Sequence, residues 1–379
     1  MINKPDGDDV YAGVPKDYTG CDVNADNFVA ILKGDADSVS GGSGKVIDSS
    51  ADDKVFVAFF DHGGPGILGV PGGCGDFLYA NDVNKALTDK FAANGFKELT
   101  FYVEACESGS IFEGLLPANI STYVTTAANA DESSWGYYCP GMTPAPPSEF
   151  NTCLGDFYSI TWMENADSAD LSVETLEKQY KVVRDIVGKN GTYDQGSHVM
   201  QYGDTDISNE TVSEFIPAAK DASEAYDWMQ WIPASARKWI KAEPKAAVKN
   251  AAVEQRDADL HSLWHVYLSK PAGSDAKAKA FKAFQAETNR RAELDAAVAN
   301  VAAALLSEDQ LNGERKAGEP VTRDWDCYKQ GVKAFEAQCG ALGQYGLKHA
   351  GVMAKACNAG KTPADITVAA GKACVGVAL

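Results

Sequence analysis

Short apolar runs alternate with amphipathic segments over the first 200 residues. Apolar runs of strand length occupy residues 54–60, 99–105 and 121–128, and helical spacing of apolar residues occupies 81–95 and 172–191. Gly95 and Gly191 close these two helical segments and are expected to cap them. Because strands separated by helices form mostly parallel sheets with helices on both faces, the pattern predicts an α/β fold for residues 1–207.

The rest of the chain has a different character. Residues 139–153 contain four prolines between Cys139 and Cys153, which predicts an extended loop closed by a disulfide. Residues 208–256 are expected to be a linker with short helices, and 257–379 an Ala-rich helical domain. One helix face there is expected to carry Phe281, Phe284, Leu294, Val298, Val301 and Leu305.

Charge divides the chain in the same place. Residues 1–233 carry 13 Lys and Arg against 37 Asp and Glu, whereas residues 234–379 carry 21 against 16. A net charge of −19 makes nucleic acid a poor partner. The asymmetry would let the C-terminal half attract the acidic half, although acidity by itself is also typical of a merely soluble surface. No apolar run is long enough to span a membrane, and no metal or nucleotide motif is present, so we expect no cofactor.

Two strand runs end in residues that carry chemistry. The run 54–60 is followed by His62 and Gly63, and the run 99–105 is followed by Cys106. Because parallel strands end at the same edge of a sheet, His62 and Cys106 are expected to face one substrate, with the histidine activating the thiol. The N–H of Gly63 could then help to hold an oxyanion. A lone histidine or cysteine is more often an ordinary structural residue, so only the matched pair makes this hypothesis persuasive.

The stretches around these residues resemble a known family. "VFVAFFDHGGPGILGVP" (55–71) and "FYVEACESGSIFEGLLP" (101–117) are similar to the two motifs of the legumains, or vacuolar processing enzymes. The match continues in "TTAANADESSWGYYCPG" (125–141) and "SHVMQYGD" (197–204), and "DWDCYKQGVKAFEAQCGALGQYGLKH" (324–349) resembles the family's C-terminal prodomain. The resemblance covers essentially the whole chain and is closer to the plant type.

The resemblance implies a caspase-like core with a death-domain-like helical prodomain. It implies an endopeptidase zymogen that cuts after Asn, and after Asp more weakly, until the prodomain that inhibits it is removed. Cys106 corresponds to the nucleophile, His62 to the general base, and the N–H groups of Gly63 and Cys106 to the oxyanion hole. Residues Glu104, Ser133 and Asp156 correspond to the pocket for the substrate Asn. The implied disulfides are Cys139–Cys153, Cys327–Cys357 and Cys339–Cys374.

The sequence departs from the family pattern in three places. A pocket arginine expected upstream of the matching region has no counterpart, because residues 1–183 contain no arginine and the first is Arg184. We therefore expect an N-terminally shortened chain without a signal peptide, and assign the implied activity most securely to the full-length protein. Glu254 stands where plant-type members carry the Asn at which they cut themselves, so Asn250 becomes the expected processing site and Asp257 a weaker one. Cys21 and Cys74 have no evident family partner; they could pair with each other or stay free, and free thiols are favoured.

Other functions stay open at this point. A peptide asparaginyl ligase would resolve the same thioester with an amine, although Tyr137, a bulky residue after "WG", favours hydrolysis weakly. An inactive form could act only as an inhibitor or binding module. The family implies protein substrates and a vacuolar, lysosomal or secretory location. The charge asymmetry further suggests a latch in which prodomain cations meet core carboxylates, including those near Glu104 and Asp156, until acid protonates them.

Overall fold

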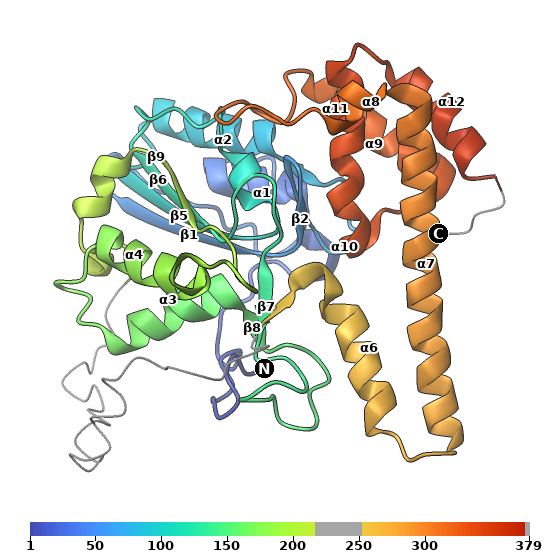
Figure 1. The fold of residues 1–379 in the computed structure, drawn as a ribbon. Helices are drawn as coiled ribbons and strands as arrows, with labels where there is room; N and C mark the ends of the chain where they lie inside the picture. The colour runs from blue at the N-terminus through green and yellow to red at the C-terminus, as the bar shows by residue number, and fades with distance from the viewer. Residues whose placement is uncertain (217–251, 376–379) are drawn as a thin grey trace.

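The computed structural model describes residues 1–216 and 252–375, which form a sheet-containing core and a helical C-terminal domain beside it (Figure 1). The central sheet has the order β1-β5-β6-β9. Strands β1, β5 and β6 are parallel, and β9 is antiparallel to β6. Their bounds are Lys54–Phe60 (β1), Glu98–Glu104 (β5), Thr122–Thr126 (β6) and Met200–Gly203 (β9). This mostly parallel sheet confirms the predicted fold class.

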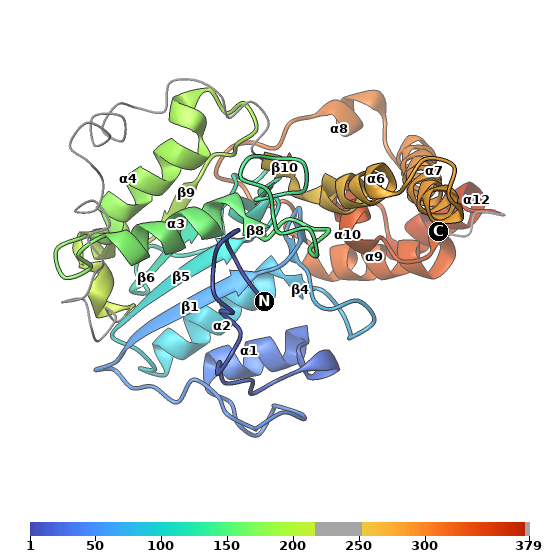
Figure 2. The ribbon, with the colours of Figure 1, turned by 90° about the horizontal axis from the view of Figure 1, so that it is seen from below.

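Helices cover both faces of this sheet (Figure 2). One face carries α1 (Ala25–Lys33) and α2 (Ala80–Ala92), and the other carries α3 (Phe157–Ser168) and α4 (Leu176–Val187). Side chains of β5 alternate between the two layers, as a strand's two-residue period requires. Leu99, Phe101 and Val103 pack with the α2 side, and Tyr102 packs with the α3 and α4 side. This two-sided burial explains why β5 is apolar almost throughout.

Two small sheets stand at the carboxyl end of the central strands. One joins β2 (Gly63–Gly64), β3 (Ile67–Leu68) and β4 (Leu78–Tyr79). The other has the order β10-β7-β8, with bounds Ala252–Glu254 (β10), Trp135–Tyr137 (β7) and Gly155–Asp156 (β8). Because β10 precedes the C-terminal domain, the second sheet joins the linker to the core. The 3₁₀ helices are Gly20–Asp22, Ser108–Ile111, Lys189–Gly191, Thr205–Asn209, Val212–Glu214, Gln255–Asp257 and Leu347–His349.

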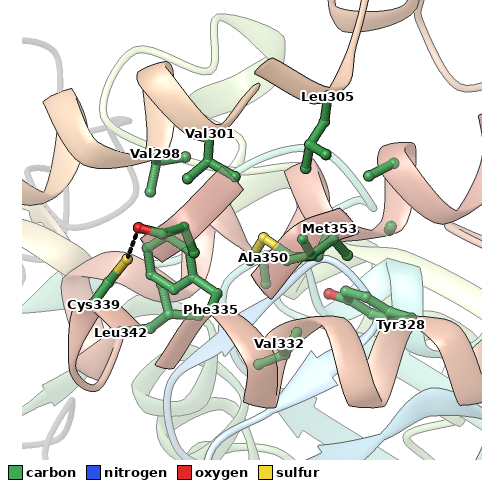
Figure 3. Close-up of a cluster of buried hydrophobic side chains, with 14 of the residues drawn as sticks. Val298, Val301, Leu305, Tyr328, Val332, Phe335, Cys339, Leu342, Ala350 and Met353 are labelled. Atoms are coloured by element: carbon green, nitrogen blue, oxygen red, sulfur yellow. Dashed lines mark hydrogen bonds between the residues drawn. The ribbon is translucent and has the colours of Figure 1, made fainter. Parts of the chain in front are cut away.

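The C-terminal domain begins with a helical hairpin of α6 (Ala258–Ser269) and the long helix α7 (Asp275–Leu305) (Figure 1). It continues through α8 (Glu308–Asn312), α9 (Trp325–Cys339), α10 (Gly343–Gly346), α11 (Ala350–Asn358) and α12 (Pro363–Ala373). Figure 3 shows its core, in which Val298, Val301 and Leu305 of α7 meet Tyr328, Val332 and Phe335 of α9. Disulfides Cys327–Cys357 and Cys339–Cys374 tie α9 to α11 and to the residue that follows α12.

The expected helix face is only partly a core face. Leu294, Val298, Val301 and Leu305 lie in the domain core, but Phe281 and Phe284 do not. The N-terminal half of α7 extends beyond the bundle, where Phe281 packs on Tyr267 and Phe284 on Trp264 of α6. The expected cap at Gly95 is also wrong: α2 ends at Ala92, and Asn94 adopts the positive φ of 54°.

The expectation of free thiols at Cys21 and Cys74 is wrong, because the structure joins them in a disulfide. The two residues are 53 positions apart, and the fold places the loop before β4 next to the start of α1. Such a long-range approach leaves no mark in the local sequence. The structure also pairs Cys139 with Cys153, and Cys106 is the free cysteine.

The C-terminal domain meets the core through ion pairs and apolar contacts. Lys329 lies 2.7 Å from Asp82, Lys333 lies 2.5 Å from Asp76, and Arg315 lies 2.8 Å from Glu113 and 2.9 Å from Asp131. Tyr328 donates a hydrogen bond to the Pro65 carbonyl at 2.6 Å. The basic C-terminal domain therefore pairs its cations with carboxylates of the acidic core.

These ion pairs do not include Glu104 or Asp156, but Arg256 of the linker pairs with Glu107, three residues after Glu104. Glu104 itself accepts hydrogen bonds from Ser159 of α3. In the described ranges, no helix combines the length and the apolar character that a membrane crossing requires.

Candidate active site

His62 and Cys106 stand at equivalent places on neighbouring strands. Phe60 of β1 is the register partner of Glu104 of β5, and each functional residue follows its strand end by two positions. The Asp61 N–H donates to the Glu104 carbonyl at 3.2 Å, which extends the pairing beyond the strands. Parallel strands thus bring the predicted pair to one sheet edge.

Gly63 lies directly against Cys106. A Cβ at Gly63 would collide with the carbonyl oxygen of Cys106 and with the Ala105 side chain. Only glycine therefore allows the two backbones to approach this closely. This packing explains the glycine that follows His62 in the sequence, and it brings the N–H groups of Gly63 and Cys106 into one neighbourhood.

Gln255 occupies the space between the histidine and the cysteine. Its Oε1 lies 2.9 Å from His62 Nδ1 and 3.2 Å from Cys106 Sγ, with the thiol as donor. Cys106 is buried, and burial raises the pKa of its thiol to about 11. Arg256 lowers that pKa less than burial raises it. In this arrangement the thiol is protonated, and its acceptor is the glutamine.

Residues 252–255 lie along β7 as an added strand. Val253 pairs with Gly136 in antiparallel register, and the Gln255 N–H donates to the Ser134 carbonyl at 3.0 Å. Extended peptides often bind proteins by this kind of strand addition. The strand β10 ends at Glu254, and the side chain of the next residue, Gln255, is the one that contacts Cys106.

Buried carboxyl groups gather beside Cys106. Glu104 is almost fully buried, and its Oε2 accepts hydrogen bonds from the Ser159 N–H at 2.9 Å and the Ser159 hydroxyl at 2.7 Å. Its other oxygen, Oε1, has no hydrogen-bond partner among the residues that the structure describes. Burial, and next the Asp156 carboxyl, raise the pKa of Glu104 well above its usual range.

Asp156 belongs to the same group. Burial raises its pKa to about 7, and the nearby Asp61 carboxyl adds to the shift. Since carboxyl groups that crowd together cannot all ionise, the cluster holds protons near neutral pH. It can therefore both accept hydrogen bonds from an amide NH2 group and donate one to an amide carbonyl.

Ser133, the third expected pocket residue, contacts the linker instead. Its hydroxyl donates to Glu254 at 2.5 Å and accepts from Arg256 Nη1 at 2.7 Å. Arg256 is buried and also pairs with the buried Glu107 carboxylate. The linker therefore engages the three residues Ser133, Cys106 and His62.

Glu107 bears on the expected acid latch. Burial raises its pKa to about 7 although Arg256 opposes the shift. Arg256, which the linker supplies, lowers the pKa of Glu107, so this ion pair by itself weakens when acid protonates the carboxyl. The expected acid latch therefore stays a prediction at Glu107, where burial raises the pKa overall and the ion pair with Arg256 opposes that shift.

Tyr137 lies in β7 opposite Ala252, and its ring stacks on Phe157 with centroids 4.5 Å apart. Next to it, the loop 139–153 is covered by α6, whose His261 lies 2.7 Å from the Pro140 carbonyl.

Asn250, the expected processing site, lies outside the described residues. In the ranges 1–216 and 252–375, no three His, Cys, Asp or Glu side chains form a group that could hold a metal ion.

Sequence reasoning missed several residues of this site. Ser134 and Ser159 were overlooked, although Ser134 directly follows Ser133 in the quoted motif. Gln255 and Arg256 belong to the stretch "EQRDAD", whose sequence indicates a self-cleavage segment and not a contact with Cys106. Their long separation from Cys106 in the chain hid their position, because only the fold brings residue 255 next to residue 106.

A histidine and a free cysteine at adjacent ends of a caspase-like parallel sheet define the class of cysteine peptidases. Comparisons with known proteins agree. Residues 1–229 match the Peptidase C13 family, and residues 282–374 match the legumain prodomain. The chain belongs to the Peptidase C13 family. It is a cysteine-type asparaginyl endopeptidase with a C-terminal legumain prodomain.

Several plant enzymes are similar to this chain. A vacuolar-processing enzyme of Vicia sativa is 46% identical over 387 residues, which cover 100% of this chain and 74% of the relative. The vacuolar-processing enzyme beta-isozyme of Arabidopsis thaliana is 46% identical over 378 residues, covering 99% and 74%. A legumain of Canavalia ensiformis is 42% identical over 380 residues, covering 99% and 77%.

Proposed function

We propose that Cys106 is the nucleophile and His62 the general base of peptide-bond cleavage after Asn. His62 takes the proton of the Cys106 thiol, and Sγ attacks the carbonyl carbon of the Asn residue. The N–H groups of Gly63 and Cys106 hold the resulting oxyanion. His62 returns the proton to the leaving amine, and water then hydrolyses the thioester.

In this proposal, Glu104 and Asp156 recognise the Asn side chain. The unpaired Glu104 Oε1 accepts the amide NH2 group, and a protonated carboxyl in the cluster donates to the amide carbonyl. An Ala side chain would leave these buried groups unpaired, which is costly, so discrimination against it is strong. Ser133 lines the same pocket once Glu254 and Arg256 have left it.

We further propose that the chain is a zymogen whose linker and prodomain block its own site. The observation that carries this proposal is the contact of Gln255 Oε1 with both His62 and Cys106. Residues 252–255 run along β7 as a substrate would, and Gln255 stands where the substrate Asn would stand. Glutamine is longer than asparagine by one methylene, so its amide group meets the catalytic pair and not the carboxyl pocket.

Activation then requires both cleavage of the linker and dissociation of the C-terminal domain. We propose Asn250 as the processing site and the domain limits 1–207, 208–256 and 257–379. A cut after Asn250 leaves residues 252–256 attached to the C-terminal domain, so the site opens only when that domain leaves. The names of the plant relatives support a vacuolar location, and protein substrates with Asn before the cut bond follow from the pocket.

A peptide series tests this function. Peptides that differ only in having Asn, Asp, Gln or Ala before the cut bond are incubated with the acid-processed full-length protein and with its Cys106→Ala variant. We expect cleavage in the order Asn, then Asp, with no cleavage after Gln or Ala, and none at all in the variant. Equal cleavage after Ala and Asn would overturn the pocket assignment.

A further inference from the structure

The loop between β3 and β4, residues 69–77, borders the catalytic histidine. It begins at Gly69, whose N–H donates to the His62 carbonyl at 2.8 Å. Its sequence, GVPGGCGDF, contains four glycines, and Gly73 and Gly75 adopt φ of 79° and 120°. A glycine-rich, largely exposed loop of this kind has many alternative conformations and needs a tether to hold one of them.

The Cys21–Cys74 disulfide is such a tether. It fixes the middle of the loop to the turn just before α1, which packs with α2 against the central sheet. Inside the loop, the Cys74 N–H donates to the Pro71 carbonyl at 3.0 Å. The loop conformation therefore depends on a covalent bond to a distant, rigid part of the core.

The loop forms one wall of a cavity of about 430 Å³ that opens at His62. Val70, Pro71 and Phe77 line it from the loop, and Lys333, Gln344 and Leu347 line it from the C-terminal domain. Because residues 252–255 reach Cys106 along β7, the chain before a cut bond lies on the β7 side. The chain after the cut bond must leave on the His62 side, where this cavity lies.

We propose that the loop 69–77, held by the Cys21–Cys74 disulfide, positions the segment that follows the cut bond. This proposal rests on the proposed function of His62 and Cys106. The wall persists when the C-terminal domain leaves, because Cys21 and Cys74 both belong to the core. When the disulfide is open, the glycines allow the loop 69–77 to change conformation. A long substrate segment after the cut bond then loses its contact with the loop, whereas the segment before the cut bond stays bound along β7.

The disulfide is also the most exposed of the four. Cys21 is exposed and Cys74 half-buried, whereas Cys139 and the four cysteines of the C-terminal domain are buried. Accessible disulfides exchange first with an external thiol. Limited reduction of the folded protein, with peptide mapping, therefore opens this bond selectively and provides a second route to the untethered loop if a variant does not fold.

The test uses two peptides with the same residues up to and including Asn, one continuing for one residue and the other for four. In the double variant Cys21→Ser/Cys74→Ser, the kcat/KM ratio of the long to the short peptide should fall about fivefold. The matched control Cys139→Ser/Cys153→Ser opens a disulfide on the β7 side and should keep the wild-type ratio. An unchanged ratio in the Cys21→Ser/Cys74→Ser protein overturns the proposal.

A second readout does not depend on activity. Amide hydrogen exchange over residues 69–77 should become about tenfold faster in the double variant or after selective reduction, with little change in β1 and β5. Unchanged exchange in this loop overturns the tether. If the acid-processed wild-type protein cleaves neither peptide, the proposed function fails, and the exchange result still decides whether the disulfide holds the loop.

Discussion

Gln255 lies on Cys106, with its Oε1 3.2 Å from the sulfur, although 149 residues separate them in the chain. The contact closes the site from within, because the same oxygen also meets His62 at 2.9 Å. The residue is held there by strand pairing on one side and by the buried Arg256 on the other. The segment that closes the site is therefore the same segment that attaches the C-terminal domain to the core.

Replacing Gln255 by Asn should turn the blocking strand into a substrate. The shorter side chain reaches the Glu104 and Asp156 pocket, and the carbonyl of residue 255 then stands at Cys106. We expect a new cut between positions 255 and 256, detected by mass spectrometry of the fragments. Gln255→Ala is the control, since it opens the site without offering an amide. Identical fragments from Gln255→Asn and wild type would show that residue 255 does not occupy the Asn position.

Processing at Asn250 is a separate prediction. The purified zymogen is expected to be stable near neutral pH and to cut itself in acid after Asn250. Asn250→Gln should remove that fragment boundary, because glutamine is too long for the pocket. Equal processing at neutral and acid pH would reject the acid trigger, and an unchanged boundary in Asn250→Gln would reject the site.

His265 gives acid release of the C-terminal domain the expected sign. Burial against the loop 139–153, and next His261, lower the pKa of His265 in the docked form. A histidine with a lowered docked pKa stays neutral when docked but takes a proton when free. Docking is therefore fully stable above the ordinary histidine value of about 6.5 and weakens as pH falls below it. Other titratable groups on α6 and on the elements packed against it include Tyr138, Glu149, Asp257, Asp259, His261, Tyr267, Lys270, Asp275, Lys277, Glu287, Arg290 and Arg291.

His265→Gln should move the pH of half-release of the C-terminal domain to a lower value. Release can be measured by size-exclusion chromatography of the cut protein across pH. His198→Gln is the control, since His198 pairs with Glu132 inside the core at 2.9 Å. The assignment is wrong if both variants release the domain at the wild-type pH.

Glu104→Gln should reduce kcat/KM for an Asn peptide by about a hundredfold, because the buried acceptor of the amide NH2 group is lost. Preference for Asn over Ala should fall by a similar factor. Glu98→Gln changes a glutamate at the opposite end of the same strand, where it pairs with Lys54, and should leave the preference unchanged. A wild-type preference in Glu104→Gln would remove this residue from the pocket.

The sequence predicted the sheet and its chemistry because both depend on local signals. The run 54–60 coincides with β1, and the shared end of β1 and β5 follows from parallel pairing. It could not predict the Cys21–Cys74 bond or the place of Gln255, since both depend on approaches between distant segments. The raised pKa of Glu107 also required the fold, because burial outweighs the ion pair with Arg256.

The central claim is that Cys106 and His62 act as one catalytic unit. The most direct measurement is kcat/KM for an Asn peptide in the full-length, acid-processed protein and in its Cys106→Ala, His62→Ala and double variants. The account predicts that each single variant loses about a thousandfold or more and that the double variant loses no more than Cys106→Ala alone. Cleavage near the wild-type rate in Cys106→Ala, or losses that multiply in the double variant, would contradict it.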